Sequence, residues 1–382
     1  MYKDFSKDPA YDKCIVPFAE IVHNRLNIEI LRGCTRGCRF CQAGVMYRPV
    51  RERSAKNICD SVITGLEKTG HDEVSLMSLS STDHSQIEEI LSTLNKKLDG
   101  SGARISIPSQ RLDSFGMDMA KLVAGNKKGG LTFAVEAGSQ RLRDVINKNV
   151  SEDDIFSATK YAFENGWNRA KLYFMIGLPT ETDDDLIAIA DLCERVLEAA
   201  RESAGDKRKH GVNLGVSCAI FVPKPQTPFE VYGQISMDEA KRRINLIRQN
   251  LHSKAIDFSW HDPETSMLEA VVSRGGREIC DLIYEAWKAG AKFDAWDEFF
   301  NFEAWLKAAK KCKLDLQEVA SRDLQDDLPW GHIDFGVDRA FFESERERAR
   351  AGKTTADCTF DKCQNCGVCT NLKVKNDIAG KR

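Results

Sequence analysis

The chain has 382 residues, of which 42% are apolar and 30% charged, a composition that suits a globular protein with a sizeable core. Its formal net charge of −3 gives no sign of a polyanionic partner, and the basic run at 207–209 is expected to be a solvated loop. No stretch approaches the about 18 apolar residues of a membrane span, and the opening MYKDFSKDPAYDK lacks a signal-peptide core. These features predict a cytoplasmic protein with no membrane segment and no strong sign of nucleic-acid binding.

Short apolar runs alternate with amphipathic segments from residue 27 to about residue 222. The runs expected to form strands are NIEILRG (27–33), EVSLMSLS (73–80), ARISIPS (103–109), LTFAVEA (131–137), RAKLYFMIG (169–177) and NLGVSCAIFVP (213–223). Helical spacing lies between them, as in residues 84–98, where apolar side chains recur at Ile87, Ile90, Leu91, Leu94 and Leu98. Strand and helix repeated six times predict an α/β fold with a parallel sheet and right-handed crossovers, a partial (β/α)6 TIM-like barrel.

Local signals mark where several elements begin and end. Helices are expected to begin at sequences that resemble capping boxes: Ser151 with Asp154, Thr182 with Asp185, and Ser236 with Glu239. The segment GNKKGG (125–130) is expected to be a turn. The pattern predicts four regions: an N-terminal extension (1–26), the barrel (27–235), a helical segment (236–350) and a cysteine-rich tail (351–382).

Seven of the 13 cysteines fall in two tight groups: Cys34, Cys38 and Cys41, and then Cys358, Cys363, Cys366 and Cys369. Because cytoplasmic thiols stay reduced, both groups are expected to be metal ligands rather than disulfides. The first group follows the first strand, and barrels of this kind gather their chemistry on the loops after the carboxyl ends of the strands. This position favours a working metal centre over a buried structural site.

The number of thiols in the first group indicates the kind of centre. A [4Fe–4S] cluster has four irons, so three thiolates leave one iron free to chelate a substrate or cofactor. A structural zinc site would close with a fourth Cys or His, and the nearest His outside the loop, His23, precedes the strand. A cluster is therefore the favoured interpretation, and zinc is the alternative.

The loop CTRGCRFC (34–41) resembles the signature of the radical S-adenosylmethionine (SAM) enzymes. In that superfamily the open iron binds the amino and carboxylate groups of SAM, and one electron cleaves SAM to a 5′-deoxyadenosyl radical. The resemblance implies that Phe40 packs near the adenine. It also implies that SLSSTD (78–83) approaches the SAM amino group, with Ser80 and Ser81 where glycines are more usual.

The fourth strand and the turn after it are similar to another motif of the superfamily. FAVEAGSQRLRDVINK (133–148) resembles the strand, turn and helix that bind the SAM ribose and carboxylate, and Ser139 lies in its turn. The resemblance implies that Glu136 faces the ribose or the amino group and that Lys148 pairs with the carboxylate. A carboxylate suits hydroxyl or ammonium groups of a ligand, and a cation suits a carboxylate. The alternative for Lys148 is a solvated helix lysine.

Further resemblances extend along the rest of the chain. MIGLPTET (175–182) implies that Gly177 lets the backbone approach the adenine, and FVPKPQTPFE (221–230) resembles the proline-rich element after the sixth strand. With HDPETSMLEAVVSRG and CQNCGVC, these stretches resemble an uncharacterised group of cobalamin-domain-associated radical SAM proteins. The 26 residues before the first strand are too few for that domain, so either a separate cobalamin-binding subunit is the partner or cobalamin is not used. The resemblance also implies a reductase or flavodoxin-type electron donor.

Residues 236–350 read as several helices with interspersed tryptophans. These are Trp260, Trp287, Trp296, Trp305 and Trp330, and acidic residues interleave with them. They are therefore expected to pack in a core or lid rather than to stack on nucleic acid. His261, which follows the barrel closely, is a candidate proton donor or substrate ligand, with a structural role as the alternative.

The tail carries Cys358, Cys363, Cys366 and Cys369 within twelve residues. The polar residues and glycines around them cannot build a core, so a bound metal is expected to order the segment. A second [4Fe–4S] cluster and a four-thiolate zinc site both fit, and the ferredoxin-like spacing favours the cluster. A centre closed by four ligands suits electron relay or structure more than substrate binding.

The leading interpretation is an enzyme that cleaves SAM reductively and abstracts hydrogen from an unknown substrate. Methyl transfer, thiomethyl transfer and rearrangement are the reactions considered. One alternative is a two-cluster electron-transfer protein without SAM chemistry, which the SAM-binding motifs argue against. The other is a zinc-stabilised RNA-binding module, which the net charge disfavours.

Overall fold

The computed structural model describes residues 5, 13–108, 111–114, 122, 131–206, 211–324 and 328–381. The turn expected at 125–130 and the basic run at 207–209 lie outside these residues. Within the described ranges, no helix combines the length and the apolar character that a membrane crossing requires.

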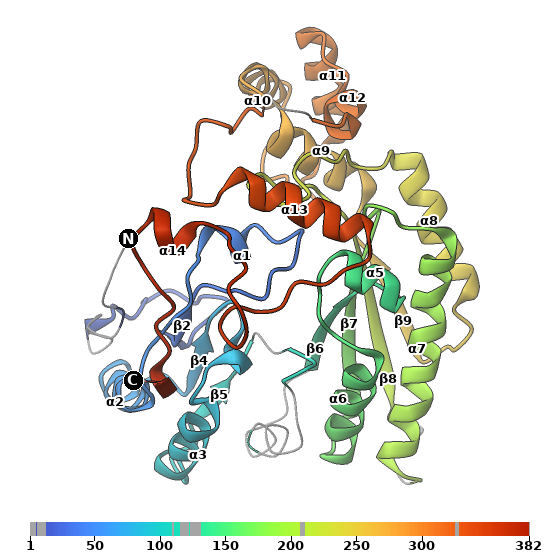
Figure 1. The fold of residues 1–382 in the computed structure, drawn as a ribbon. Coiled ribbons are helices and arrows are strands. Elements are labelled where there is room, and N and C mark those ends of the chain that lie inside the picture. Colours follow the sequence, from blue (N-terminus) through green and yellow to red (C-terminus); the bar gives the residue numbers. More distant parts are fainter. Residues whose placement is uncertain are drawn as a thin grey trace.

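The expected strands are present in two parallel sheets (Figure 1). One contains β1 (Leu26–Glu29), β4 (Glu73–Met77) and β5 (Arg104–Ser106), and the other β6 (Leu131–Glu136), β7 (Arg169–Ile176), β8 (Asn213–Ile220) and β9 (Ile256–Trp260). Neighbouring strands in both sheets run parallel, so their carboxyl ends meet at one edge of each sheet. The predicted α/β class is confirmed, while β9 occupies a region that was expected to be helical.

Helices connect the strands and cover the sheets. They include α2 (Ala55–Thr69), α3 (Ile87–Lys97), α6 (Glu152–Glu164), α7 (Asp183–Ala204) and α8 (Met237–Asn250). Helix α2 packs on β1 and β4, and α7 packs between α6 and α8. The apolar stripe predicted in α3 is buried, since Ile87, Ile90, Leu91 and Leu94 all belong to the main core.

Two of the predicted capping boxes are confirmed. At α6, the Asp154 N–H donates to the Ser151 hydroxyl (3.1 Å) and the Asp154 carboxylate accepts the Ser151 N–H (2.8 Å). The reciprocal arrangement is also present at the start of α7. At α8 only half the box forms, because the Glu239 carboxylate pairs with arginines of the helix instead of the N-cap N–H.

Most buried hydrophobic residues in the described ranges belong to a barrel core or to a second core, and two smaller clusters are separate from these. Ala240, Ile244 and Ile247 of α8 lie in the barrel core. The second core is formed mainly by α9 (Pro263–Arg274), α10 (Glu278–Lys288), α11 (Phe302–Cys312) and α12 (Leu316–Ser321). The region boundaries predicted from the sequence stay a proposal.

The tryptophans of this region do not all pack as expected. Trp305 and Trp330 are buried, but Trp260, Trp287 and Trp296 are 41%, 56% and 55% exposed. For the exposed three the expectation of core packing was wrong. Trp287 stacks on Tyr284 and Trp296 meets Phe293 edge to face, so the exposed rings pair with each other on the surface.

The tail returns to the beginning of the barrel (Figure 1). After α13 (Arg339–Arg350), the chain runs past α14 (Val368–Asn371) to η5 (Ala379–Lys381). On this path it meets the hairpin of β2 (Leu31–Arg32) and β3 (Arg51–Glu52), which flanks α1 (Ala43–Met46). The Glu52 N–H donates to the Asp377 carbonyl (2.8 Å), and the Asp377 N–H donates to the Val50 carbonyl (2.8 Å).

Candidate functional site

The loop with Cys34, Cys38 and Cys41 lies between β2 and α1. Gly33 allows the chain to enter it: its φ is +94°, and a Cβ there would lie 2.4 Å from the Pro49 carbonyl oxygen. Within the loop, the Cys41 N–H donates to the Cys38 carbonyl (3.1 Å). The second and third thiols therefore share one tight turn.

The three thiols act on one another electrostatically. Burial and then the neighbouring Cys38 raise the pKa of the Cys34 thiol to about 12, and the same causes raise the pKa of Cys41. A metal centre supplies the positive charge that such crowded thiolates need. The Gly44 N–H also donates to Cys41 Sγ (3.4 Å), a contact typical of a ligating sulfur. The residues fit a [4Fe–4S] cluster held by three cysteines.

A single metal ion places different demands on its ligands. In the described part of the chain, no group of three or more His, Cys, Asp or Glu side chains is arranged to hold one ion. A zinc ion needs every ligand atom at about 2–2.3 Å from one point, whereas a cluster attaches each thiolate to a separate iron.

Glu136 and Lys148 lie beside this loop and bond to each other. Lys148 Nζ donates to Glu136 Oε1 (3.0 Å). The charge of Lys148 lowers the pKa of the Cys41 thiol, and the charge of Glu136 raises it. Glu136 ends β6 with a φ of +72°, a left-handed conformation that is costly for a residue with a side chain and typical of functional sites. Lys148 is 8% exposed and lies beyond α5 (Gln140–Val145), so a solvated helix lysine does not describe it.

The serines expected near SAM already have partners within the protein. The Ser80 hydroxyl donates to the Asp83 carboxylate (2.6 Å), and the Ser81 hydroxyl donates to the Leu76 carbonyl (3.0 Å). Ser139 caps α5 by accepting the Leu142 N–H (3.1 Å). Ser80 is the N-cap of η3 (Ser81–Asp83), Ser81 is its first residue, and Ser139 is the N-cap of α5.

Gly177 lies where β7 ends, with a φ of +84° and a Cβ position 3.0 Å from the Ile235 side chain. Its N–H donates to Glu181 Oε2 (2.6 Å). Glu181 was not singled out from the sequence, although it lies in the quoted MIGLPTET motif. Burial raises the pKa of Glu181 to about 7, opposed by the Gly177 N–H and by Arg243. This carboxylate therefore holds the turn in which Gly177 lies.

Phe40 and His261 occupy different surroundings. Phe40 is partly buried and packs against the cluster that contains Ala137, Leu142 and Phe221. His261 is exposed just after β9, and its N–H donates to the Cys218 carbonyl on β8 (2.9 Å). Because β9 is three strands from β6 in the sheet, His261 is not brought next to Glu136.

An ion-pair network around Arg36 was not predicted. Arg36 bonds to Asp83, to Asp113 (3.0 Å) and to Asp357 (3.3 Å), which joins the cysteine loop to η3 and to the tail. Arg111 Nη2 donates to the Lys148 carbonyl (3.1 Å). The sequence signal that could have indicated this network is the position of Arg36 between Cys34 and Cys38.

Arg39 anchors the same loop from the inside. It is fully buried, and Nη1 donates to the Asp144 and Val145 carbonyls (3.0 and 2.8 Å) at the end of α5. Its Nε donates to Glu345 on α13 (3.0 Å), and Nη2 donates to the Lys353 carbonyl in the tail (2.7 Å). One side chain thus ties the cysteine loop to three distant segments.

The four tail thiols also act on one another. Cys366 is buried, Cys358 is partly buried, and Cys363 and Cys369 are exposed. Burial and then Cys366 and Cys363 raise the pKa of Cys369, while burial also raises the pKa of Cys358, with Cys366 contributing. Two of the sulfurs accept N–H bonds, Cys363 Sγ from Asn365 (3.3 Å) and Cys358 Sγ from Asn376 (3.8 Å). The donor set fits a thiolate-bound metal centre.

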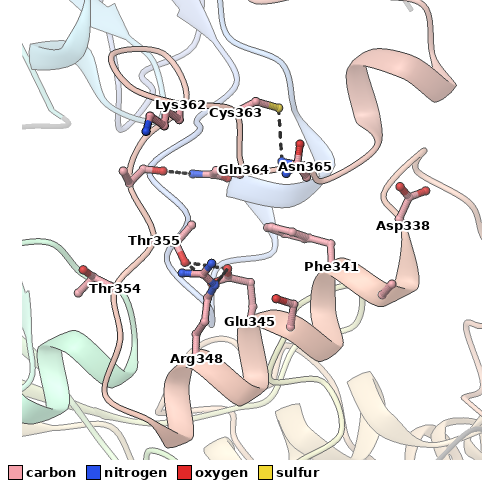
Figure 2. A pocket seen from close by; sticks show the side chains of 13 residues that line it. Asp338, Phe341, Glu345, Arg348, Thr354, Thr355, Lys362, Cys363, Gln364 and Asn365 are labelled. Carbon is pink, nitrogen blue, oxygen red and sulfur yellow. Dashed lines mark hydrogen bonds and ion pairs between the residues drawn. The ribbon is translucent and has the colours of Figure 1, made fainter.

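The tail packs directly on the first cysteine loop. Gln364 Nε2 donates to the Thr35 carbonyl (2.8 Å), and the Thr355 N–H donates to Asn147 Oδ1 (2.7 Å). Figure 2 shows Thr355 meeting Glu345 of α13 and Cys363 facing the Asn365 backbone. Residues 353–364 are therefore the outer support of the Cys34–Cys41 loop.

A cavity of about 500 Å³ lies between α13 and the tail (Figure 2). Phe341 and Arg348 line it from the helix, and Lys362 and Cys363 line it from the tail. One of the exposed tail thiols thus borders this cavity.

Comparison with known proteins found one matching family model and two related proteins. Residues 28–193 match the model of the radical SAM superfamily. An uncharacterised protein of Methanocaldococcus jannaschii is 30% identical over 279 residues, which are 73% of this chain and 56% of that protein. The ribosomal protein uS12 methylthiotransferase RimO of Treponema denticola is 26% identical over 184 residues, 41% of this chain and 39% of that protein.

Among solved structures, the radical SAM methyltransferase TsrM of Kitasatospora setae is similar, with a TM-score of 0.44 and 14% identity. The match covers 54% of this chain and 38% of TsrM. The chain thus spans only 56% and 39% of the two curated relatives. The matched segment, residues 28–193, contains the first cysteine loop and the β1, β4, β6 and β7 strand ends described above, and it is a radical SAM domain.

Proposed function

We propose that this chain is an enzyme that generates a substrate radical from SAM. The observation that carries the proposal is the position of the Glu136–Lys148 ion pair beside Cys41, in a loop of three thiols. A [4Fe–4S] cluster and SAM bound there supply one-electron cleavage of SAM to methionine and a 5′-deoxyadenosyl radical, which abstracts a hydrogen atom from the substrate.

The residues around the loop have distinct proposed roles. Lys148 pairs with the SAM carboxylate, and Glu136 accepts hydrogen bonds from the ribose or the amino group. Their mutual ion pair keeps both charges compensated while SAM is absent. The backbone at Ser80 and Ser81 receives the amino group, and the Gly177 turn and Phe40 border the adenine. His261 is proposed as a proton donor or substrate ligand.

The reaction proposed is methyl transfer, thiomethyl transfer or rearrangement. The partial similarity to a methylthiotransferase supports thiomethyl transfer. A reductase or flavodoxin-type donor is the proposed electron source, and a separate cobalamin-binding subunit is a further proposed partner.

The function is tested by incubating anaerobically reconstituted protein with SAM and dithionite. We expect 5′-deoxyadenosine and methionine to appear, measured by chromatography. If neither forms in protein that holds its iron, the two-cluster electron-transfer protein becomes the better description. Zinc in place of iron would instead favour the RNA-binding module.

Lys148→Ala is expected to weaken SAM binding by about 1.5–3 kcal/mol, the range for a hydrogen bond between charged groups. The dissociation constant of SAM for cluster-loaded protein measures this effect. Lys160→Ala is the matched control, because Lys160 is an exposed lysine paired with Glu164 on α6. An unchanged dissociation constant in Lys148→Ala would remove Lys148 from the SAM site.

The tail is proposed to hold a second [4Fe–4S] cluster, with an electron-relay or structural role. Anaerobically reconstituted protein should then contain about eight irons, and replacing Cys363 and Cys366 by Ala should reduce the number to about four. Iron analysis and electron paramagnetic resonance of the reduced protein measure the two clusters. About four irons and one tightly bound zinc in the unaltered protein would make the tail a structural zinc site.

A further inference from the structure

Arg48 is a buried arginine with incomplete bonding. It is 4% exposed, and its Nε donates to the Gly44 carbonyl (2.9 Å). Its Nη1 is buried without a hydrogen-bond partner in the described part of the chain. Leaving a buried guanidinium group short of partners costs several kcal/mol unless an anion compensates its charge. A negative charge near Arg48 would therefore stabilise the folded protein.

The tail thiols are a source of negative charge on which Arg48 acts. The Arg48 guanidinium lies over the Phe341 ring, 5.4 Å from its centre, and Phe341 packs in the same cluster as Cys366. The charge of Arg48 also acts on the Cys358 and Cys369 thiols, where it opposes the effect of burial. Arg48 thus approaches the tail thiols from the side of the barrel.

The backbone beside Arg48 is also linked to the tail thiols, through Asn376. The Val50 N–H donates to Asn376 Oδ1 (3.1 Å), and Asn376 Nδ2 donates to Cys358 Sγ (3.8 Å). One side chain therefore bridges the Arg48–Val50 segment and a tail sulfur. Arg48 thus brings a positive charge, and Asn376 a neutral N–H donor, to this side of the thiols.

We propose that Arg48 is the charge partner of an anionic centre formed by the four tail thiolates, a positioning residue that sets the reduction potential of that centre. The inference rests on the tail metal centre of the proposed function. Four thiolates outweigh the charge of a zinc ion or an oxidised [4Fe–4S] core, so either centre is anionic. Reduction of a cluster adds a further negative charge, which a buried cation stabilises.

The test uses protein in which Cys34, Cys38 and Cys41 are replaced by Ala, so that the tail holds the remaining centre. Arg48→Met keeps the length of the side chain and removes its charge. Arg51→Met is the matched control: Arg51 is also buried and bonds to the Tyr47 and Pro49 carbonyls, but its charged neighbours are Arg32 and Glu29. Arg48→Lys keeps a positive charge, so its midpoint potential should remain near that of the parent protein.

The midpoint potential of the tail cluster is followed by electron paramagnetic resonance. We expect Arg48→Met to lower the equilibrium constant for one-electron reduction about tenfold, a shift of about 59 mV to more negative potential. Arg51→Met should leave it unchanged. An unchanged potential in Arg48→Met, or an equal shift in Arg51→Met, would overturn the proposal. If Arg48→Met fails to fold, Arg48→Gln takes its place: the same shift supports the proposal, and an unchanged potential overturns it.

Metal analysis of the unaltered protein separates this inference from the proposed second cluster. If the tail binds zinc, the cluster proposal fails, and Arg48 is tested by competition with a chelator. Arg48→Met should then lose zinc at about a tenth of the chelator concentration that Arg51→Met withstands. Equal retention would overturn the inference, and so would a tail that binds neither iron nor zinc.

Discussion

Replacing Cys34, Cys38 and Cys41 together by alanine should abolish release of 5′-deoxyadenosine from SAM. The three thiolates are the proposed protein ligands of the cluster, and no electron reaches SAM without it. The measurement is the dithionite assay on reconstituted protein, with iron analysis beside it. About four irons should remain in the tail. Retained SAM cleavage in the triple variant would contradict the assignment of this loop.

The control is a second triple variant that removes three other thiols. Cys14 and Cys280 are exposed and Cys312 is partly buried, and none belongs to the two cysteine groups. Their replacement by alanine should leave SAM cleavage unchanged. Both variants should fold, because the core of the barrel is built from other side chains, as far as the described residues show it. Far-UV circular dichroism checks this.

Arg39→Met should lower the free energy of unfolding by about 3–5 kcal/mol. The change removes the 3.0 Å ion pair of buried Glu345, whose pair with Arg348 is longer (3.9 Å). It also leaves the Asp144, Val145 and Lys353 carbonyls without the Arg39 donors. Urea denaturation of the iron-free, reduced protein measures the effect.

Arg104→Met provides the comparison for this prediction. Arg104 is 45% exposed and pairs with Asp72 on the surface, so its loss should cost less than about 1 kcal/mol. Equal stability of Arg39→Met and Arg104→Met would show that the buried pair contributes no more than the surface pair. Iron content is measured in both variants. A low iron content in Arg39→Met but not in Arg104→Met would show that Arg39 supports the cysteine loop in addition to stabilising the whole fold.

The strands were predictable because each is an apolar run of suitable length. Strand β8 is buried along most of its length, and NLGVSCAIFVP shows this directly. Strand β9 was missed because it lies at the edge of its sheet, and most of IDFSW is exposed or partly exposed. Its sequence has no continuous apolar run, and helical patterns surround it. Pairing with β8, rather than local preference, makes it a strand.

The proximity of the candidate site residues was predictable where they are close in sequence or belong to recognisable motifs. Cys34, Cys38 and Cys41 share one loop, and the motifs pointed to Glu136 and Lys148 at the adjoining strand end. The mutual ion pair of the last two was not predictable, because it depends on the path of the chain after α5. The hydroxyl of Ser139 is used to cap that helix, a role that its place before QRLRDV could have indicated.

The contacts between the tail and the loop have a consequence for the order of events during synthesis. Lys353, which receives a bond from Arg39, lies 314 positions later in the chain. At about 5–20 residues per second, roughly 16–60 s pass between the emergence of the two residues from the ribosome. Iron delivered in that interval would meet a loop without its outer support. The contacts between residues 353–364 and the loop therefore form late in the synthesis of the chain.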